Sequence, residues 1–237
     1  IQNELRDFRL GGADLSPPDK KRFSDIQLEL SALSAKFSEN LLDATNAFTL
    51  HIHDEAHLSG LPDNVKDAAR EAAKIDNLPG WKFTLQAPCL IPVLQYADDA
   101  ALRETFYREN ATRASEFGKP EWDNTSLIQR MLELRAELAA LLGYDNFAEI
   151  SLATKMARSP TEVTQFLHDL AVKAKPFAER DYAELRDFAA AKVGIAQLEP
   201  WDASYVSEKL RQELYTYSEE IIRKHFPLPK VLEGLFK

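Results

Sequence analysis

Residues Ser16–Thr45 read SPPDKKRFSDIQLELSALSAKFSENLLDAT, and this stretch decides the fold class of the chain. Apolar side chains return every three or four positions along it, at Phe23, Ile26, Leu30, Leu33, Phe37 and Leu41. That spacing places them on one face of an α-helix. Ser16 is a typical N-cap residue, and Pro17 fits the first helical turn. The stretch therefore predicts one long amphipathic helix that ends near Thr45.

The same periodicity recurs on both sides of this helix, so we expect a mainly α-helical, multi-helix chain. Asp98, Ser159 and Asp202 are predicted N-caps, and Ser159 forms a capping box with Glu162. The further predicted helices cover residues 1–10, 62–75, 98–107, 124–141, 159–188, 202–214, 218–226 and 229–236.

Two short runs alternate apolar and polar residues, as a half-buried β-strand does. They are Thr49–His53 and Lys82–Gln86, which we expect to pair as a small two-stranded element. Residues 1–237 otherwise read as one helical region, and Gly118–Asn124 is the most loop-like place for a subdivision. The chain opens and stops on apolar helical patterns at Ile1 and Lys237, so we expect it to be a piece of a longer protein.

Composition excludes several classes of protein. The chain has 29 Lys and Arg against 38 Asp and Glu, a net charge of −9, which argues against nucleic acid as a partner. Its longest apolar stretch, Cys89–Leu94, is too short to span a membrane. A single cysteine fits a reducing compartment, so we expect a cytoplasmic protein. No Gly-rich phosphate-binding loop occurs.

The string His51-Ile52-His53-Asp54-Glu55-Ala56-His57 is the most tempting metal-site candidate. His53 and His57 stand four apart, which suits two zinc ligands on one helix face. A zinc-peptidase motif, however, needs a glutamate directly after the first histidine, and Asp54 stands there. The run before it also reads as a strand. We therefore interpret the string as a solvated strand end and turn.

Other candidates have simple structural interpretations. Cys89 lies in an apolar stretch and is expected to be a small buried side chain, while Glu208 and Lys209 fit a solvated helix face. Trp201, Asp202 and Tyr205 gather where a loop enters a helix, with Asp202 as its cap and Trp201 as a packed staple. The other interpretation is contact with substrate, because loop aromatic residues sometimes mark binding surfaces. The residues alone give no complete catalytic constellation.

Several strings together resemble the thimet oligopeptidase family of zinc metallopeptidases, most closely its bacterial oligopeptidase A branch. They run in collinear order from one end of the chain to the other. The strings are Phe8–Leu15 (FRLGGADL), Leu33–Asn40 (LSAKFSEN), Asp43–Asn46 (DATN), Leu78–Trp81 (LPGW), Tyr96–Asp98 (YAD), Tyr107-Arg108, Thr112–Ser115 (TRAS), Ser151–Ala157 (SLATKMA), Pro200–Asp202 (PWD), Tyr205, Ser207–Lys209 (SEK) and Phe226-Pro227.

The resemblance implies a two-lobed, channel-forming metallopeptidase fold whose whole protein hydrolyses oligopeptides with one zinc ion. In the family a His-Glu-x-x-His helix and a later glutamate hold the zinc, and both lie beyond Lys237. No catalytic or metal residue is therefore carried over to this chain, and we expect the 237 residues alone to be inactive and to bind no zinc. Trp201, Asp202 and Tyr205 are the substrate-channel candidates. Val206 departs from the family, which commonly has a second tyrosine there.

A function of a different class fits the same helices. A self-standing, non-catalytic scaffold that binds peptides or a protein partner would need no metal motif. The oligomeric state and the peptide preference stay open at this point.

Overall fold

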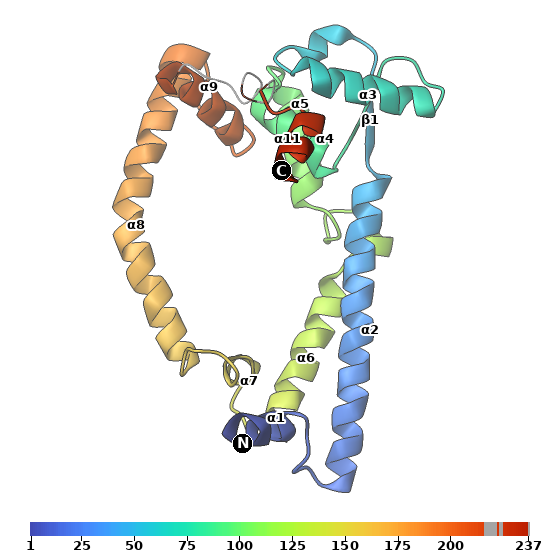
Figure 1. Ribbon diagram of the computed structural model, residues 1–237, viewed down its shortest axis with the longest axis vertical. Coiled ribbons are helices and arrows are strands. Elements are labelled where there is room, and N and C mark those ends of the chain that lie inside the picture. Colours follow the sequence, from blue (N-terminus) through green and yellow to red (C-terminus); the bar gives the residue numbers. More distant parts are fainter. Residues whose placement is uncertain (216–221, 223–224, 237) are drawn as a thin grey trace. The chain divides into compact units, whose positions relative to one another are not determined.

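The computed structural model describes residues 1–215, 222 and 225–236. It is mainly α-helical with a small two-stranded sheet, as the sequence predicts (Figure 1). The elements in chain order are α1 (Gln2–Leu10), α2 (Pro17–Ala47), β1 (Thr49–Ile52), η1 (Glu55–Leu58), α3 (Asp63–Ile75), β2 (Trp81–Thr84), α4 (Ala87–Tyr96), α5 (Ala100–Ala111), η2 (Pro120–Trp122), α6 (Thr125–Leu141), α7 (Phe147–Leu152), α8 (Pro160–Phe188), the π-helical η3 (Ala189–Val193), α9 (Ala203–Tyr215) and α11 (Leu228–Leu235).

The chain divides into two compact units. The first consists of Ile1–Ala44 and Thr112–Ala178, and the second of Thr45–Ala111 and Glu179–Lys237. The loop-like segment Gly118–Asn124 lies inside the first unit.

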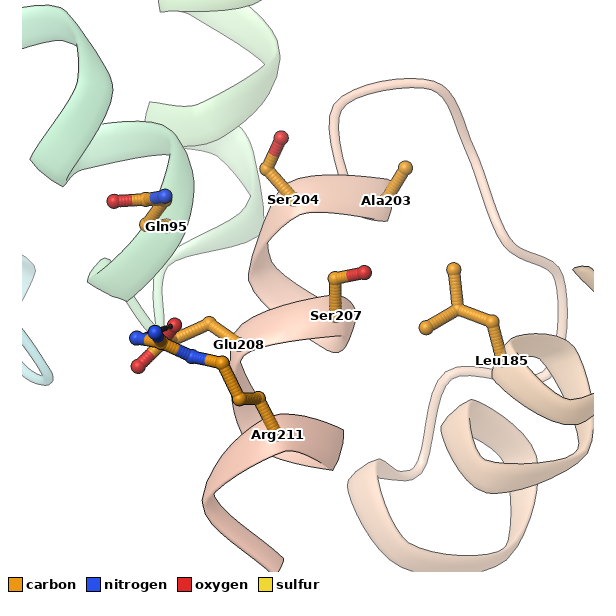
Figure 2. A pocket seen from close by; sticks show the side chains of 7 residues that line it. All are labelled: Gln95, Leu185, Ala203, Ser204, Ser207, Glu208 and Arg211. Carbon is orange, nitrogen blue, oxygen red and sulfur yellow. Dashed lines mark ion pairs between the residues drawn. The ribbon is translucent and has the colours of Figure 1, made fainter. Parts of the chain in front are cut away.

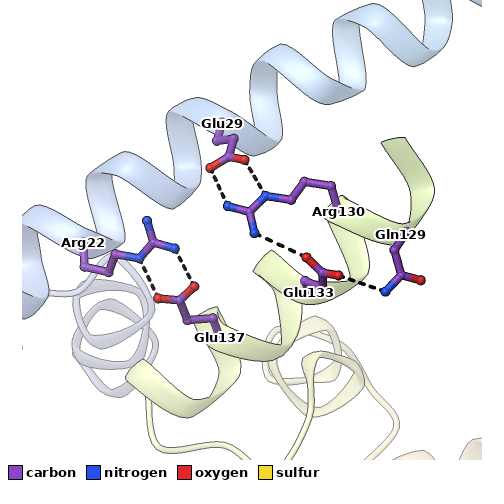
Figure 3. A network of polar contacts seen from close by, with 6 residues as sticks. All are labelled: Arg22, Glu29, Gln129, Arg130, Glu133 and Glu137. Atoms are coloured by element: carbon purple, nitrogen blue, oxygen red, sulfur yellow. Dashed lines mark hydrogen bonds and ion pairs between the residues drawn. The ribbon is translucent and has the colours of Figure 1, made fainter. Parts of the chain in front are cut away.

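The first unit is built on the packing of α2 against α6. Ile26, Leu134 and Leu138 form its buried centre. Two ion pairs run along the same helix pair, and in one of them Arg130 donates to both oxygens of Glu29 at 2.6 and 3.1 Å (Figure 3). Apolar burial supplies most of the stability here, because such partly exposed pairs contribute about 1 kcal/mol or less.

The second unit surrounds the antiparallel pair of β1 and β2. Leu50 faces Phe83 and Ile52 faces Trp81 across the sheet. Phe106 of α5 is fully buried and places its ring edge-on to Phe83, at a centroid distance of 6.4 Å. A separate cluster of Ala189, Tyr205 and Val206 fixes α9 beside the end of α8.

One helix was not predicted, and one helix cap was predicted at the wrong residue. Ala87–Tyr96 forms helix α4, although Pro88 and Pro92 hid it from the periodicity. The N-cap of α5 is Asp99 rather than Asp98, because Asp99 Oδ1 accepts the N–H groups of Ala101 at 2.9 Å and Leu102 at 3.3 Å. The helix predicted over 218–226 lies largely outside the described residues.

Candidate functional site

Arg103 of α5 is the centre of a buried polar cluster in the second unit. Its side chain is 1% exposed, and its Nη2 donates to Asp202 Oδ1 at 2.6 Å. Its Nη1 donates to the carbonyl oxygens of Ala97 at 2.7 Å and Asp98 at 3.1 Å. A buried guanidinium costs several kcal/mol unless such partners neutralise and hydrogen-bond it. Arg103 therefore joins α5, the turn before it and the start of α9.

Asp202 stands where the sequence predicts the N-cap of α9, but its carboxylate does not accept hydrogen bonds from the first N–H groups of that helix. One oxygen pairs with Arg103, and the other accepts the N–H of Glu199 at 3.3 Å. Only the backbone oxygen of Asp202 serves the helix, by accepting the N–H of Val206 at 2.8 Å. The predicted side-chain cap is thus replaced by a buried ion pair.

Tyr205 continues the cluster along α9. The guanidinium of Arg103 lies over its ring, 4.1 Å from the centroid, and its hydroxyl donates to Asp98 Oδ1 at 2.7 Å. Burial and the hydrogen bond to Asp98 raise the pKa of Tyr205 to about 12. The phenol therefore stays protonated at neutral pH and acts as a hydrogen-bond donor.

Asp98 connects this cluster to η1. It accepts a hydrogen bond from Ser59 Oγ at 2.8 Å, and its backbone N–H donates to the Ser59 carbonyl oxygen at 2.9 Å. Burial alone would raise the pKa of Asp98, but the hydrogen bonds from Tyr205 and Ser59 outweigh it and hold the pKa below its usual value. The carboxylate is therefore ionised at neutral pH, and Lys209 Nζ lies 3.4 Å from it.

Trp201 differs from its two neighbours because part of its ring stays accessible. Asp202 and Tyr205 are only 4% and 7% exposed, whereas Trp201 is partly buried. The Arg108 guanidinium lies 5.0 Å from the Trp201 ring centroid, and the Tyr107 ring packs edge-on at 6.2 Å. As packed, only Trp201 of the three offers a surface to a ligand. Substrate contact by these residues stays a prediction.

A hollow of about 610 Å³ runs along α9 in the same unit (Figure 2). Ala203, Ser204 and Ser207 of α9 line it, with Gln95 of α4 on one side and Leu185 of α8 on the other.

Glu208 lies in this hollow and was expected on a solvated helix face. That prediction was wrong, because Glu208 is only 5% exposed. Its carboxylate pairs with Arg211 Nη2 at 2.6 Å and accepts from Gln212 Nε2 at 2.9 Å. The hollow therefore has hydroxyl and amide groups on its walls and a neutralised charge pair within it.

Comparison with known proteins decides the family. Residues 93–237 match the model of Peptidase family M3. The chain belongs to this family. Oligopeptidase A of Haemophilus influenzae is 44% identical over all of this chain and 35% of its own length. Oligopeptidase A of Escherichia coli is 45% identical with the same coverage, and dipeptidyl carboxypeptidase of Escherichia coli is 30% identical over 97% of this chain.

The chain spans about a third of the length of these M3 relatives. Arg103 and its partners Asp98, Asp202 and Tyr205 all lie within residues 93–237, the part of the chain that matches the family model. In the described residues, no helix is long and apolar enough to cross a bilayer.

The three clustered histidines do not form a zinc site of the kind that the M3 resemblance implies. His51 lies on β1 opposite Lys82, and His53 is exposed after the strand. His57 Nδ1 lies 2.7 Å from Asp99 Oδ2 instead. Across residues 1–215, 222 and 225–236, no group of three or more His, Cys, Asp or Glu side chains could hold a metal ion. These side chains therefore do not fit the zinc of the family.

The sequence predicts Cys89 to be a small buried side chain, and in the structure it is partly buried against the core of the second unit. Its Sγ accepts the N–H of Thr84 at 3.3 Å. Burial raises the pKa of the thiol, which keeps it protonated at neutral pH. The arrangement is that of a packing residue rather than a nucleophile.

Proposed function

We propose that these residues form part of a zinc metallo-oligopeptidase that hydrolyses short peptides in the cytoplasm. The observation that carries this proposal is the identity of 44–45% to two oligopeptidase A proteins along the whole of the chain. The match to Peptidase family M3 over residues 93–237 agrees with it. The family resemblance implies a His-Glu-x-x-His helix and a later glutamate as zinc ligands, and this sequence contains no His-Glu-x-x-His string, so the proposal assigns the zinc to another part of the protein.

Within that protein, these helices form part of the wall of the peptide-binding channel. The ion pair of Arg103 and Asp202 fixes the start of α9, and the accessible face of Trp201 sits directly before it. The serines along α9 offer hydroxyl groups that can hydrogen-bond an extended peptide backbone. The role of this chain is therefore to position substrate, and residues 1–237 alone have no hydrolytic activity.

The test is hydrolysis of a quenched fluorescent peptide by two proteins, the isolated chain and a protein that spans the full length of the relatives. We expect turnover by the longer protein only, its loss on adding a zinc chelator, and its return with added zinc. Zinc-dependent turnover by the isolated chain would overturn the proposal. Peptide binding without turnover by the longer protein would also overturn it, and would favour the non-catalytic scaffold.

A further inference from the structure

A second hollow, of about 470 Å³, lies in the first unit, where no predicted site residue is found. It is lined by three cationic side chains, Arg6, Lys155 and Arg158, against a single carboxylate, Glu149. Such an excess of positive charge stands out in a chain whose net charge is −9. Anions are therefore favoured in this hollow over cations.

Two of the three cations carry charge that no acid offsets within the described residues. Lys155 Nζ donates to the Ser151 hydroxyl at 2.8 Å and forms no ion pair there. The Arg158 guanidinium has neither a hydrogen bond nor an ion pair in the part of the chain that the structure describes, where only the backbone N–H of this residue is engaged. Arg6, by contrast, pairs with Asp7 at 2.9 Å. Lys155 and Arg158 are thus the groups that can receive an incoming anion.

The nearby carboxylates accept hydrogen bonds from backbone N–H groups at the starts of helices. Glu149 Oε2 accepts the N–H of Asp145 at 3.2 Å, before α7. Glu162 accepts the backbone N–H of Arg158 at 2.6 Å, at the start of α8. Both contacts hold the carboxylates to the backbone, which leaves the two side-chain cations of the hollow available.

Apolar side chains form the rest of the lining, and they favour a ligand that carries an apolar group beside its negative charge. Met156 is fully exposed at 100%, and Leu152 and the Tyr144 ring are partly buried beside it. An exposed methionine is a soft surface that adapts to apolar partners. A free phosphate would use the cations and leave this apolar lining unused.

We propose that this hollow binds acidic peptides, with a carboxylate held by Arg158 and Lys155 and a neighbouring apolar side chain on Leu152 and Met156. The guanidinium matches a carboxylate in planar, two-point geometry. The choice of a peptide among anionic ligands rests on the proposed function. Binding itself requires no hydrolysis, so the two proposals can fail separately.

The test is fluorescence anisotropy with the labelled, C-terminally amidated peptide Glu-Leu-Glu-Leu and its neutral, likewise amidated counterpart Gln-Leu-Gln-Leu. It uses the full-length protein with chelator present, so that no peptide is cut. We expect the acidic peptide to bind about tenfold more tightly, because only its carboxylates can accept charge-assisted hydrogen bonds from Arg158 and Lys155. R158Q and K155Q should each weaken the acidic peptide about fivefold to tenfold and leave the neutral peptide unchanged.

K21Q is the matched control, since Lys21 is an exposed lysine of the same unit outside the hollow. R158K keeps the charge and should retain part of the affinity, which separates lost binding from lost folding. Equal binding of the two peptides would overturn the proposal, as would unchanged binding by R158Q. Displacement of the acidic peptide by an equal concentration of inorganic phosphate would also overturn it, because the hollow would then accept any oxyanion.

Discussion

Arg103 and Asp202 are 99 positions apart in the sequence, yet their side chains form an ion pair at 2.6 Å with exposed fractions of 1% and 6%. The pair joins α5 to the start of α9, next to Trp201. Because neither charge reaches water, each depends on the other for its neutralisation. The position of the predicted substrate-contact residue therefore depends on a salt bridge in the core.

Removal of one partner should be far more damaging than removal of both. We expect R103M and D202L each to lower the free energy of unfolding by about 3–5 kcal/mol, since each leaves a buried charge unpaired. The double variant R103M/D202L should lose much less than the sum of the two. Urea unfolding of the four proteins measures the coupling. R186A, which breaks the exposed pair with Asp187, is the control and should change stability by less than about 1 kcal/mol. Additive losses would contradict a coupled pair.

Loss of the Tyr205 hydroxyl should weaken the link between α9 and Asp98. We expect Y205F to cost about 0.5–1.5 kcal/mol at pH 7, the net value of one such hydrogen bond. The pKa of Asp98 is lowered in the folded chain, so its contribution is present above its unfolded pKa and is lost as pH falls through the folded one. Unfolding measured between pH 7 and pH 3 should therefore show a shallower acid dependence for Y205F than for the unaltered chain. Identical slopes would show that the hydroxyl does not act on Asp98.

The contact of His57 with Asp99 should make stability depend on pH in the opposite direction. The hydrogen bond to Asp99 raises the pKa of His57, so its stabilisation is complete below the unfolded pKa near 6.5 and is lost as pH rises through the folded pKa. The side chain is 60% exposed, so the effect is small. NMR titration of the imidazole should give a pKa above that of a free histidine. H57Q should remove this part of the pH dependence, and H53Q, at an exposed histidine, should leave it intact.

Substitution of Gly60, with Gly143 as the matched control, tests how closely the backbone at Gly60 approaches Tyr96. Both have positive φ, +83° and +75°, but a side chain at Gly60 would meet the carbonyl oxygen of Tyr96, whereas nothing lies within 4 Å at Gly143. We expect G143A to cost about 1 kcal/mol from backbone strain alone, and G60A to cost clearly more. Thermal unfolding of the two variants measures the difference. Equal losses would show that η1 does not sit tightly on the turn after α4.

The sequence predicts the elements whose residues repeat a simple pattern and misses one helix in which prolines interrupt that pattern. Helix α2 follows from its apolar period, and β1 and β2 follow from their alternation. Helix α4 was missed because Pro88 and Pro92 are usually helix-breaking, although Pro88 lies in the first turn where a proline is tolerated.

The site was located in part. Trp201, Asp202 and Tyr205 do lie together at the start of α9, but the partner of Asp202 comes from α5. One local signal could have indicated Arg103, since it stands three residues before Phe106 and so shares the apolar face of its helix. The choice between Asp98 and Asp99 as cap could not be made locally, because Tyr205 and Ser59 bind Asp98 from other elements.

Metal content tests the central claim most directly, namely that these residues shape a peptide site whose zinc is held by another part of the protein. Elemental analysis should compare the purified 237-residue chain with a protein that spans the full length of the M3 relatives. We predict about one zinc ion per longer protein and no stoichiometric zinc in the chain alone. Stoichiometric zinc in the isolated chain, lost in a variant that lacks His51, His53 and His57, would contradict the claim.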